Sequence, residues 1–463
     1  MAKRIKSALP EREEPEEKVV SIVKKIKKPK GLDNISTEQR VKAVKPYCPE
    51  DLLNVYTKEG ALSRSFHFGE YSHPDKTNIQ IRGYVDFYGG YAEHTRQVIS
   101  GLEETGKFAI KLTAIPAPRD LEPILANKMD WYMSNPTFHI KNSIFLAIAG
   151  PGHLRKDKLP DDDRYKIGWT MIETLDVQPD TVKWLNNVDE IYAPTKIDVE
   201  KFRRAGVKNI TWMPLGYDPN MWNVDVPKMD IANVRNRYVF GYVGSWNVRK
   251  SVKEIVTAYI TEFSSKEPVS LLMCTKYGTR KWGTEEMKEN DERWCIKWEL
   301  EQIIKELGIP REKVPHICIM DIPVHPSVLP SICARFDSLV GFSKGESTWL
   351  PGIEVGAMQK PIIQLASSCS GFMDYLYDNP YMCLNTEYLE ADQELYEGTS
   401  EYYEGEKLAH GSIKELKGAM RRVYKQHNTS QQKAIVENTY KKIEKYTWDR
   451  TINMISDRLH QIV

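Results

Sequence analysis

The residues of this sequence best suited to binding chemistry are two glutamates, Glu346 and Glu354, with seven residues between them. They lie in the stretch 337–365, DSLVGFSKGESTWLPGIEVGAMQKPIIQL, which predicts a buried strand, a polar loop, a helix starting near Gly352 and a second buried strand. A loop carboxylate can accept hydrogen bonds from sugar hydroxyls, and one in the first helical turn can bind a ribose diol while the helix dipole favours its charge. In a plainer interpretation, Glu354 only stabilises its own helix and Glu346 is a surface residue.

A second stretch with binding potential is 241–255, GYVGSWNVRKSVKEI, which predicts a strand, a turn containing Gly244 and a helix. The amides and the positive dipole end of a helix start favour an anion. Lys250 is placed to reach a phosphate, so diphosphate binding is one interpretation and a basic helix start facing water is the other. Neither a Walker pattern nor a complete G-x-G-x-x-G is present.

The composition is that of an ordinary globular protein, with 463 residues, 41% hydrophobic, 28% charged and a formal net charge of +1. The length suits two domains, and the low net charge indicates no polyanionic partner for the chain as a whole. Seven cysteines without C-x-x-C spacing predict neither a disulfide framework nor a zinc site. We expect a cytoplasmic protein, because no apolar run is long enough to span a bilayer and no signal peptide is evident.

Short apolar runs alternate with amphipathic helical segments from about residue 78 onward. This alternation predicts parallel βαβ units, and therefore an α/β protein with doubly wound sheets. It breaks at 225–236, which is rich in Pro, Asn and Asp, and then starts again. We predict a tail at 1–50, two Rossmann-like domains at 51–228 and 229–440, and a terminal helix at 441–463. A cleft between two such domains is a common ligand site.

Helices are predicted between several strands, including 91–106, 195–206 ended by Gly206, and a long charged helix at 285–308. Helical segments close the chain, the last at 439–463. The predicted strands are 79–87, 108–115, 143–150, 165–173, 189–195, 209–216, 237–244, 268–274, 316–321, 337–342, 361–365 and 381–385. The helix predicted at 251–265 has one apolar face, made by Val252, Ile255, Val256, Tyr259, Ile260 and Phe263.

The tail contains a lysine-rich segment at 18–30, KVVSIVKKIKKPK, downstream of the acidic block EREEPEE. With little to bury, the tail is predicted to be mostly disordered. Its lysines suit a contact with nucleic acid or a membrane surface, and equally a tail that only aids solubility.

The two loops together resemble those of the retaining, nucleotide-sugar-dependent glycosyltransferases of GT-B fold, the glycogen-synthase-like family. The family signature is a Glu, seven residues and a second Glu entering a helix of the form LP-x-x-E-A-M-A-x-G-x-P-V-I. Gly89-Gly90 after the first strand, MPLGYDP before the junction and YTWD before the final helix are further similarities, and the resemblance spans about 78–460. The signature positions that match in register are Leu350, Pro351, Glu354, Ala357, Pro361 and Ile363.

This resemblance implies transfer of a sugar from a UDP- or GDP-linked donor to a hydroxyl acceptor, with retention of configuration and without a metal ion or other cofactor. It implies that Glu354 binds the nucleotide ribose, Glu346 the donor sugar near the reacting carbon, and Lys250 the diphosphate. The final helix of the family crosses back to the first domain, so Trp448 is expected to be structural. The other donor-side residues implied are Gly89, Gly90, Gly244, Ser245, Arg249, Trp349 and Leu350.

Two positions of the first loop depart from the family pattern. Ser245 stands where Arg is usual, which leaves Arg249 or Arg280 to supply the phosphate-neutralising charge. Ser251 stands where Gly is common.

The signature helix and the acceptor side also depart from the pattern. Gly356 replaces the usual Met, and Gln359 replaces the usual Gly. Many members carry a His at the end of a first-domain strand, and the corresponding run IGWTMIET has none. The acceptor-side candidates are His153, Thr170 and Glu173.

Other functions stay open at this stage. The acceptor could be a hydroxylated base in DNA or RNA, with the lysine-rich tail contacting phosphates. The chain could also be a nucleotide-sugar epimerase, which shares the fold, or an inactive binding scaffold. The acidic cluster DDDR at 161–164 is expected to be a solvated loop rather than a metal site, and 285–299 an amphipathic helix rather than a partner site.

Overall fold

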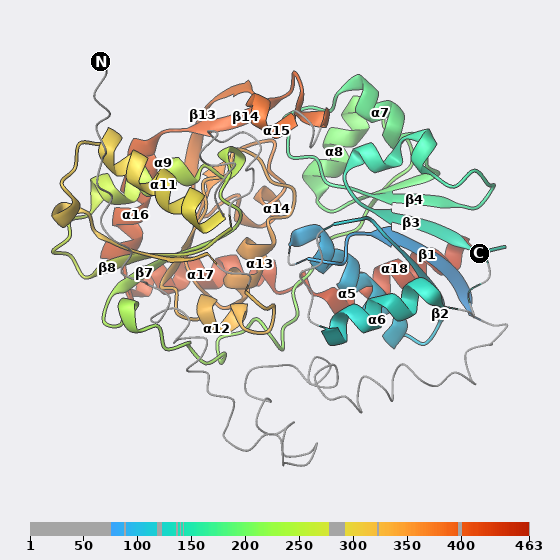
Figure 1. The fold of residues 1–463 in the computed structure, drawn as a ribbon, viewed down its shortest axis with the longest axis horizontal. Helices are drawn as coiled ribbons and strands as arrows, with labels where there is room; N and C mark the ends of the chain where they lie inside the picture. Colours follow the sequence, from blue (N-terminus) through green and yellow to red (C-terminus); the bar gives the residue numbers. More distant parts are fainter. Residues whose placement is uncertain are drawn as a thin grey trace, which may run out of the picture. The chain divides into compact units, whose positions relative to one another are not determined.

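The computed structural model describes the chain from residue 76 onward (Figure 1). The predicted tail at 1–50 lies outside the described residues. In this part of the chain no helix is both long and apolar enough to cross a membrane. The described ranges are 76–87, 89–117, 123–135, 138, 140–141, 143–276, 292–321, 324–396 and 401–462.

The first sheet has six parallel strands in the order β2-β1-β3-β4-β5-β6. The strands are β1 (Thr77–Gly83), β2 (Phe108–Ala114), β3 (Ile144–Ile148), β4 (Lys166–Trp169), β5 (Glu190–Ala193) and β6 (Ile210–Trp212). The helices are α5 (Gly90–Glu104), α6 (Pro123–Ser134), α7 (Pro179–Leu185) and α8 (Lys196–Ala205). The strand order reverses between β1 and β3, so the crevice for a ligand opens at the carboxyl ends of these two strands.

Both faces of the central strand β3 are buried, which explains why its sequence, IFLAI, is a continuous apolar run. Successive side chains of β3 point to opposite faces, and they enter different cores. Leu146 packs with α5, whereas Phe145 packs with α8. The doubly wound arrangement predicted from the alternation is confirmed, and α8 ends as predicted at Gly206, whose φ is +94°.

The second sheet has five parallel strands in the order β11-β10-β7-β8-β9. Its strands are β7 (Tyr238–Val243), β8 (Val269–Cys274), β9 (His316–Met320), β10 (Ser338–Val340) and β11 (Ile362–Ile363). Its helices are α9 (Val252–Glu262), α11 (Glu292–Glu306), α12 (Leu329–Cys333), α13 (Leu350–Ala357) and α16 (Ile413–Lys425). Here the order reverses between β7 and β10, which are the strands that precede the two predicted binding loops.

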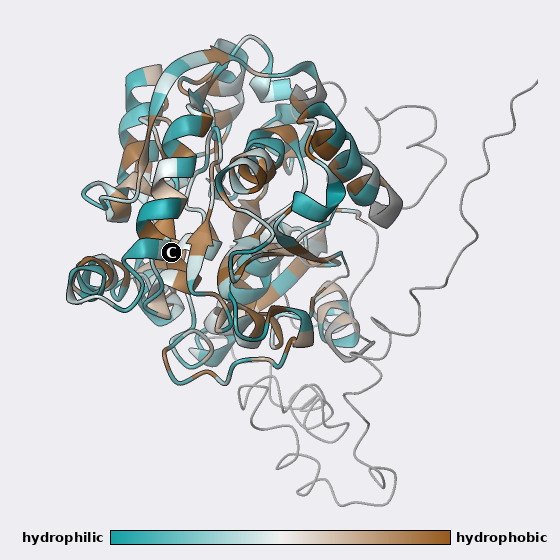
Figure 2. Ribbon diagram, turned by 90° about the vertical axis from the view of Figure 1, so that its left-hand side faces the viewer, coloured by the Kyte–Doolittle hydropathy of each residue, from teal (hydrophilic) through white to brown (hydrophobic). Residues whose placement is uncertain are grey.

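The helices carry apolar residues on their sheet-facing sides, visible as brown bands between teal ones in Figure 2. The six residues predicted to form the apolar face at 251–265 are all buried in one core with β7 and β8, which confirms that prediction. The first part of the charged helix predicted at 285–308 lies outside the described residues, and its described part is α11.

The strands predicted at 361–365 and 381–385 are present, but they do not both belong to the five-stranded sheet. The first divides into β11 and β12 (Leu365–Ala366), and the second belongs to β13 (Cys383–Glu390). With β14 (Lys407–Gly411), β12 and β13 form a separate three-stranded sheet in which β13 and β14 are antiparallel. Gln364 is the turning point, because its carbonyl accepts the Cys383 amide at 2.8 Å while its buried side chain accepts the Ser343 amide at 2.8 Å.

This small sheet carries two further short elements, α15 (Gln393–Tyr396) and a 3₁₀ turn at Glu401–Tyr403. Between β12 and β13 lies α14 (Met373–Leu376). The sequence analysis did not predict β14 or the 3₁₀ turn, and the turn contributes to the site described below.

The helix predicted at 439–463 is also divided, into α17 (Ser430–Ile443) and α18 (Trp448–Ile462). The backbone between them pairs with Tyr217, whose amide donates to the Tyr446 carbonyl at 2.9 Å and whose carbonyl accepts the Trp448 amide at 3.1 Å. A backbone that pairs with another segment cannot continue the helical ladder. Trp448 is buried in the first-domain core with α5, in the structural position expected for it.

Gly216 in MPLGYDP permits this close approach. A Cβ at position 216 would lie 2.4 Å from the carbonyl carbon of Thr447 and from the amide nitrogen of Trp448. We expect Gly216→Ala to lower the free energy of unfolding by about 2–3 kcal/mol, because backbone atoms cannot yield as a side chain can. Urea denaturation measures this. Gly152→Ala is the control, since a Cβ there meets nothing within 4 Å, and equal losses in both variants would contradict the explanation.

Candidate functional site

The loops after β7 and β10 meet at the reversal point of the second sheet. The first loop ends in a 3₁₀ turn at Val248–Lys250, where the Asn247 side chain accepts the Lys250 amide at 3.0 Å. The second loop runs from β10 to α13 and is buried from Gly341 to Trp349. The two loops are joined by the Lys344 amide, which donates to the Arg249 carbonyl at 2.8 Å.

Glu346 forms ion pairs with both cations of the first loop. Its Oε1 pairs with Lys250 Nζ and accepts the Ser343 hydroxyl at 2.7 Å, and its Oε2 lies 3.2 Å from Arg249. Burial alone would raise the pKa of Glu346, but Lys250 and Arg249 outweigh it and lower that pKa to about 2. Only 5% of Glu346 is exposed, so the alternative that it is an ordinary surface residue is wrong.

Glu173, one of the three acceptor-side candidates, joins this group from the first half of the chain. Its Oε1 lies 3.7 Å from Arg249, and its Oε2 accepts the hydroxyls of Tyr402 at 3.0 Å and Tyr403 at 2.9 Å. The Glu173 carbonyl also packs on Gly345, where an added Cβ would lie 2.0 Å from it. We call Glu173, Arg249, Lys250 and Glu346 the charge cluster.

Sequence reasoning missed Tyr402 and Tyr403. They lie in the 3₁₀ turn of the small sheet, 229 and 230 residues from their partner Glu173. Their only signal in the sequence is a pair of adjacent tyrosines in an acidic stretch, EYYEGE. Nothing in that pattern indicates which carboxylate they hold.

Glu354 lies in the second turn of α13, because the helix begins at Leu350 and not near Gly352 as predicted. Burial, and then the negative charge of Glu93 on α5, raise the pKa of Glu354 to about 8. The helix dipole still favours the charged form, as expected from the sequence, but it does not decide the protonation of Glu354 in the ligand-free protein. Desolvation and a like charge outweigh the dipole here, and the carboxyl group is mostly protonated at neutral pH.

This raised pKa predicts a pH dependence of stability. Between its ordinary value of 4.5 and about 8, Glu354 holds its proton more tightly in the folded than in the unfolded chain. The carboxyl group therefore lowers stability progressively as the pH rises through this window. We expect Glu354→Gln to raise the midpoint of thermal unfolding at pH 8.5 and to raise it much less at pH 5. The increase at pH 8.5 should be limited to several degrees, because Glu354 is only half-buried and water screens part of the charge.

The control for this prediction is Glu254→Gln, which removes a carboxylate from the first turn of α9. This variant measures the effect of removing an unrelated carboxylate, and the effect of Glu354→Gln at pH 8.5 should exceed it. A Glu354→Gln effect that does not grow with pH would contradict the prediction.

Gly89 and Gly90 lie at the start of α5, whereas Gly244 lies in the loop between β7 and the 3₁₀ turn at Val248–Lys250. Gly89 is the N-terminal cap of α5, and a Cβ on Gly90 would meet nothing within 4 Å. Backbone amides at this end can therefore approach a ligand closely. Gly244 follows β7, and the Ser245 carbonyl accepts the Tyr242 hydroxyl at 2.9 Å.

Trp349 and Leu350 are placed differently from each other. The Trp349 backbone is left-handed, with φ 55° and ψ 71°, and its ring is buried in the core of the second half against Phe372. Gly352 leaves room for the indole, because a Cβ there would lie 2.3 Å from it. The ring is thus a core element, whereas Leu350 packs against the core of the first half.

The remaining acceptor-side candidates lie on the first sheet. His153 follows β3, and its Nε2 is 3.1 Å from the Tyr84 hydroxyl beside β1. Burial, with the charges of Lys158 and Arg82, lowers the pKa of His153 to about 4. Thr170 is fully buried after β4. Within the described part of the chain, Glu173 is the candidate that pairs with Arg249, whereas no hydrogen bond or ion pair joins His153 or Thr170 directly to the charge cluster.

The structure explains the departure at Gly356, and at two other positions it shows why Gly is usual there. Ser251 and Gln359 stand where Gly is usual, and both have left-handed backbones, with φ of 53° and 55°. Gly356 stands where Met is usual because Ile443 of α17 occupies the space, 2.3 Å from an added Cβ. Arg280 lies outside the described residues, so Arg249 is the described cation that lies beside Lys250.

The acidic cluster at 161–164 behaves as a local ion pair, with Arg164 2.9 Å from Asp162. Across the described ranges, no group of three or more His, Cys, Asp or Glu side chains is arranged to hold a metal ion. Asp162 has its pKa lowered by its hydrogen bonds with Arg164.

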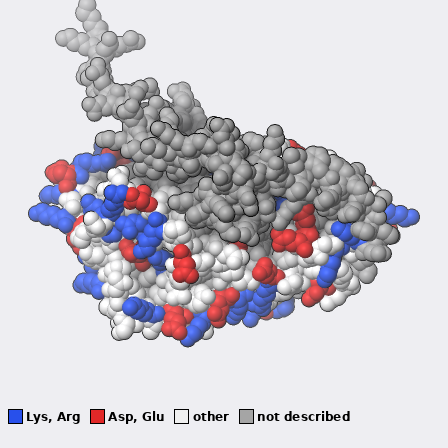
Figure 3. Space-filling view, turned by 90° about the horizontal axis from the view of Figure 1, so that it is seen from below, with Lys and Arg blue, Asp and Glu red and all other residues white. Residues whose placement is uncertain are grey.

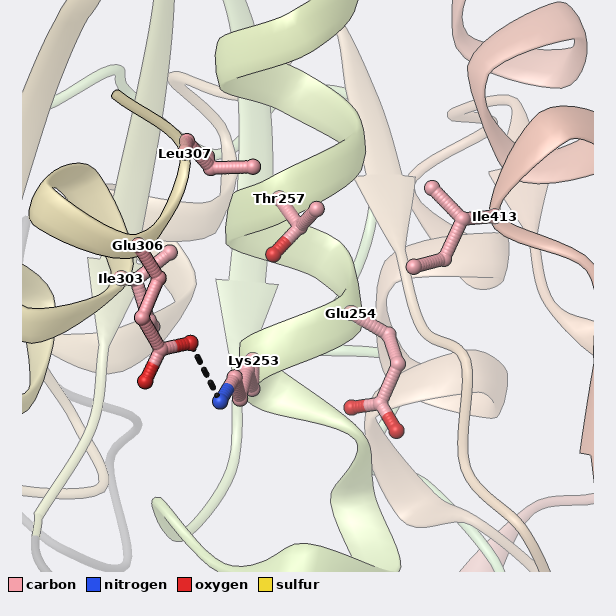
Figure 4. A pocket seen from close by; sticks show the side chains of 7 residues that line it. All are labelled: Lys253, Glu254, Thr257, Ile303, Glu306, Leu307 and Ile413. Carbon is pink, nitrogen blue, oxygen red and sulfur yellow. Dashed lines mark ion pairs between the residues drawn. The ribbon is translucent and has the colours of Figure 1, made fainter. Parts of the chain in front are cut away.

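A hollow of about 400 Å³ lies away from these loops, on the outer side of α9. Figure 4 shows the Lys253–Glu306 ion pair at its edge. None of the predicted site residues contributes to it. Its lining residues are Lys253, Glu254, Thr257, Ile303, Glu306, Leu307 and Ile413.

No protein-family model matches the chain, and no curated protein sequence matches it significantly. Solved structures match over 84% of the chain. A sucrose-phosphate synthase from Thermosynechococcus elongatus aligns with TM-score 0.57 and 12% identity over 99% of its own chain. A UDP-forming trehalose-phosphate synthase from Burkholderia xenovorans aligns with TM-score 0.56 and 10% identity over 99% of its chain.

An E. coli trehalose-6-phosphate structure bound with UDP-2-fluoro glucose has TM-score 0.56 and 11% identity, with 84% of this chain and all of that chain covered. At such identities the likeness is one of fold. The protein therefore has the GT-B fold of glycosyltransferases, as the resemblance of its loops implied.

Proposed function

We propose that the protein is a glycosyltransferase that moves a sugar from a nucleoside diphosphate sugar to a hydroxyl acceptor, with retention of configuration. The observation that carries this proposal is the meeting of Lys250, Arg249 and Glu346 at the reversal point of the second sheet. That edge is where open α/β sheets bind ligands. A cation pair suits a diphosphate, and the adjoining carboxylate suits a sugar.

The donor would lie along the second half of the chain. Lys250 and Arg249 would bind the diphosphate, Glu346 the sugar hydroxyls, and Glu354 the ribose diol. Gly90, with open space beside it, would let the start of α5 approach the phosphates. UDP is the favoured nucleotide, because two of the matching structures are described as UDP-forming or bound with a UDP sugar. GDP stays the second candidate.

In the reaction, the bond between the anomeric carbon and the diphosphate oxygen breaks as the acceptor oxygen bonds to that carbon, and the proton of the acceptor hydroxyl passes to an oxygen of the departing diphosphate. Positive charge develops on the sugar and negative charge on the departing diphosphate. Lys250 and Arg249 stabilise the leaving diphosphate more strongly in the transition state than in the ground state, which is what accelerates the step. Glu346 faces the developing positive charge. No protein nucleophile is assigned.

A donor screen tests the proposal. Nucleotide sugars are tested at millimolar concentration for binding, and nucleoside diphosphate release is measured against a panel of hydroxyl acceptors that includes sugars, sugar phosphates and hydroxymethylated DNA. Addition of a chelator tests the proposed independence from metal ions. Failure of every nucleotide sugar to bind would overturn the proposal, and conversion of a UDP sugar without acceptor would favour an epimerase.

The acceptor panel of the donor screen contains one nucleic acid, hydroxymethylated DNA. On the face shown in Figure 3, the visible Lys and Arg side chains are interspersed with Asp and Glu. The lysine-rich segment at 18–30 lies outside the described residues. Steep loss of oligonucleotide binding with salt, abolished by deleting residues 1–31, is the result that would favour this acceptor.

A further inference from the structure

The charge cluster contains two cations and two carboxylates, and all four side chains are largely buried. The exposed fractions are 12% for Glu173, 14% for Arg249, 17% for Lys250 and 7% for Glu346. In the ligand-free protein the formal charges cancel, which is how a protein tolerates buried charge. An incoming diphosphate must therefore compete with carboxylates for Arg249 and Lys250.

The two carboxylates differ in what they can do when a donor arrives. Glu346 adjoins the predicted sugar position and can exchange the cations for sugar hydroxyls. Glu173 is held in place by Tyr402 and Tyr403, whose hydroxyls donate to its Oε2 at 3.0 Å and 2.9 Å. Burial, with further contributions from neighbouring charges that include Glu173, raises the pKa of both tyrosines, so they remain neutral donors. Glu173 thus stays beside Arg249 as a fixed negative charge.

A fixed negative charge discriminates between the donor and its product. The diphosphate of a nucleotide sugar carries two negative charges. The released nucleoside diphosphate carries nearly three negative charges at pH 8, because the second ionisation of a terminal phosphate has a pKa of about 6. A carboxylate next to the phosphate-binding cations therefore repels the product more strongly than the donor.

We propose that Glu173 is a positioning residue that weakens the hold of Arg249 and Lys250 on the nucleoside diphosphate product and so promotes its release. This inference rests on the proposed function and deepens it. Glu173 acts through Arg249, with which it pairs at 3.7 Å, and it reaches the site from the first half of the chain. The tyrosines that hold it come from the small sheet that the sequence did not predict.

The test is equilibrium binding of UDP, UDP-glucose and uridine to the full-length protein and to Glu173→Gln at pH 8. We expect the variant to bind UDP about tenfold more tightly, UDP-glucose about fivefold more tightly, and uridine equally, because the repulsion removed scales with three charges on UDP, two on UDP-glucose and none on uridine. Product inhibition by UDP should strengthen in parallel. If Glu173 had a purely structural role, its substitution would weaken the binding of all three ligands or leave their affinities unchanged. Either outcome overturns the proposal.

Two further variants test the proposal if Glu173→Gln does not fold. Glu173→Asp retains the charge and should keep UDP binding weak, whereas tight UDP binding by this variant would overturn the proposal. Glu404→Gln removes an exposed carboxylate from the neighbouring segment and should change UDP affinity less than twofold. If GDP binds in place of UDP, the same comparison is made with GDP, GDP-mannose and guanosine. Absence of any nucleoside diphosphate binding overturns the proposed function together with this inference.

Discussion

Lys250→Ala is expected to lower kcat/KM for sugar transfer by about a thousandfold, measured as nucleoside diphosphate release with the best donor of the screen. The ammonium of Lys250 is buried beside Glu346, in a site where a charge acts with little screening by water. Alanine removes the cation that, in the proposed reaction, faces the leaving diphosphate. The fold should persist, because Arg249 still neutralises Glu346 at 3.2 Å.

Lys253→Ala provides the matched control. Lys253 lies three residues further on, is 61% exposed and pairs with Glu306 on the outer side of α9. Its loss should leave kcat/KM within twofold of the parent. Comparable losses for Lys250 and Lys253, or a Lys250→Ala enzyme within threefold of the parent, would rule out the assigned role.

Glu346→Gln is expected to lower kcat by about a hundredfold or more while binding of free UDP becomes tighter. Glutamine keeps the shape of the side chain but removes the charge that, in the proposed reaction, faces the developing positive charge of the sugar. It also removes the strongest competitor for Lys250 and Arg249, which become available to a phosphate. The opposite directions of the two effects separate this mechanism from simple disruption of the site.

The measurements are single-turnover transfer and UDP binding by calorimetry. Glu437→Gln is the control. Glu437 lies on α17, is 63% exposed and, within the described residues, forms an ion pair only with Lys441. It should change neither quantity. A parallel fall of turnover and UDP affinity in Glu346→Gln would show that the residue only maintains the loop.

The meeting of the two loops could be predicted from the sequence because both follow parallel strands of one sheet. The carboxyl ends of such strands lie at one edge, so Lys250 and Glu346, 96 residues apart, face the same crevice. The apolar face of α9 was predictable for a similar reason, because a spacing of 3.6 residues depends only on local geometry.

The protonation of Glu354 could not be predicted in this way. Its position on a helix favours a negative charge, and that is what its neighbours in sequence indicate. The opposing influences are burial and the charge of Glu93, which comes from α5 in the other half of the chain. Desolvation depends on all the atoms that surround a group, and a sequence does not show them.

The sequence by itself determined the doubly wound strands, the two loops and the residue types that suit a nucleotide sugar. These features depend on short-range periodicity and on the fixed relation between strand ends in a parallel sheet. Only the tertiary structure decided that Glu346 is buried between two cations and that Glu173 shares Arg249 with it. Tyr402 and Tyr403 reach Glu173 across more than two hundred residues, and such a contact exists only once both halves have folded.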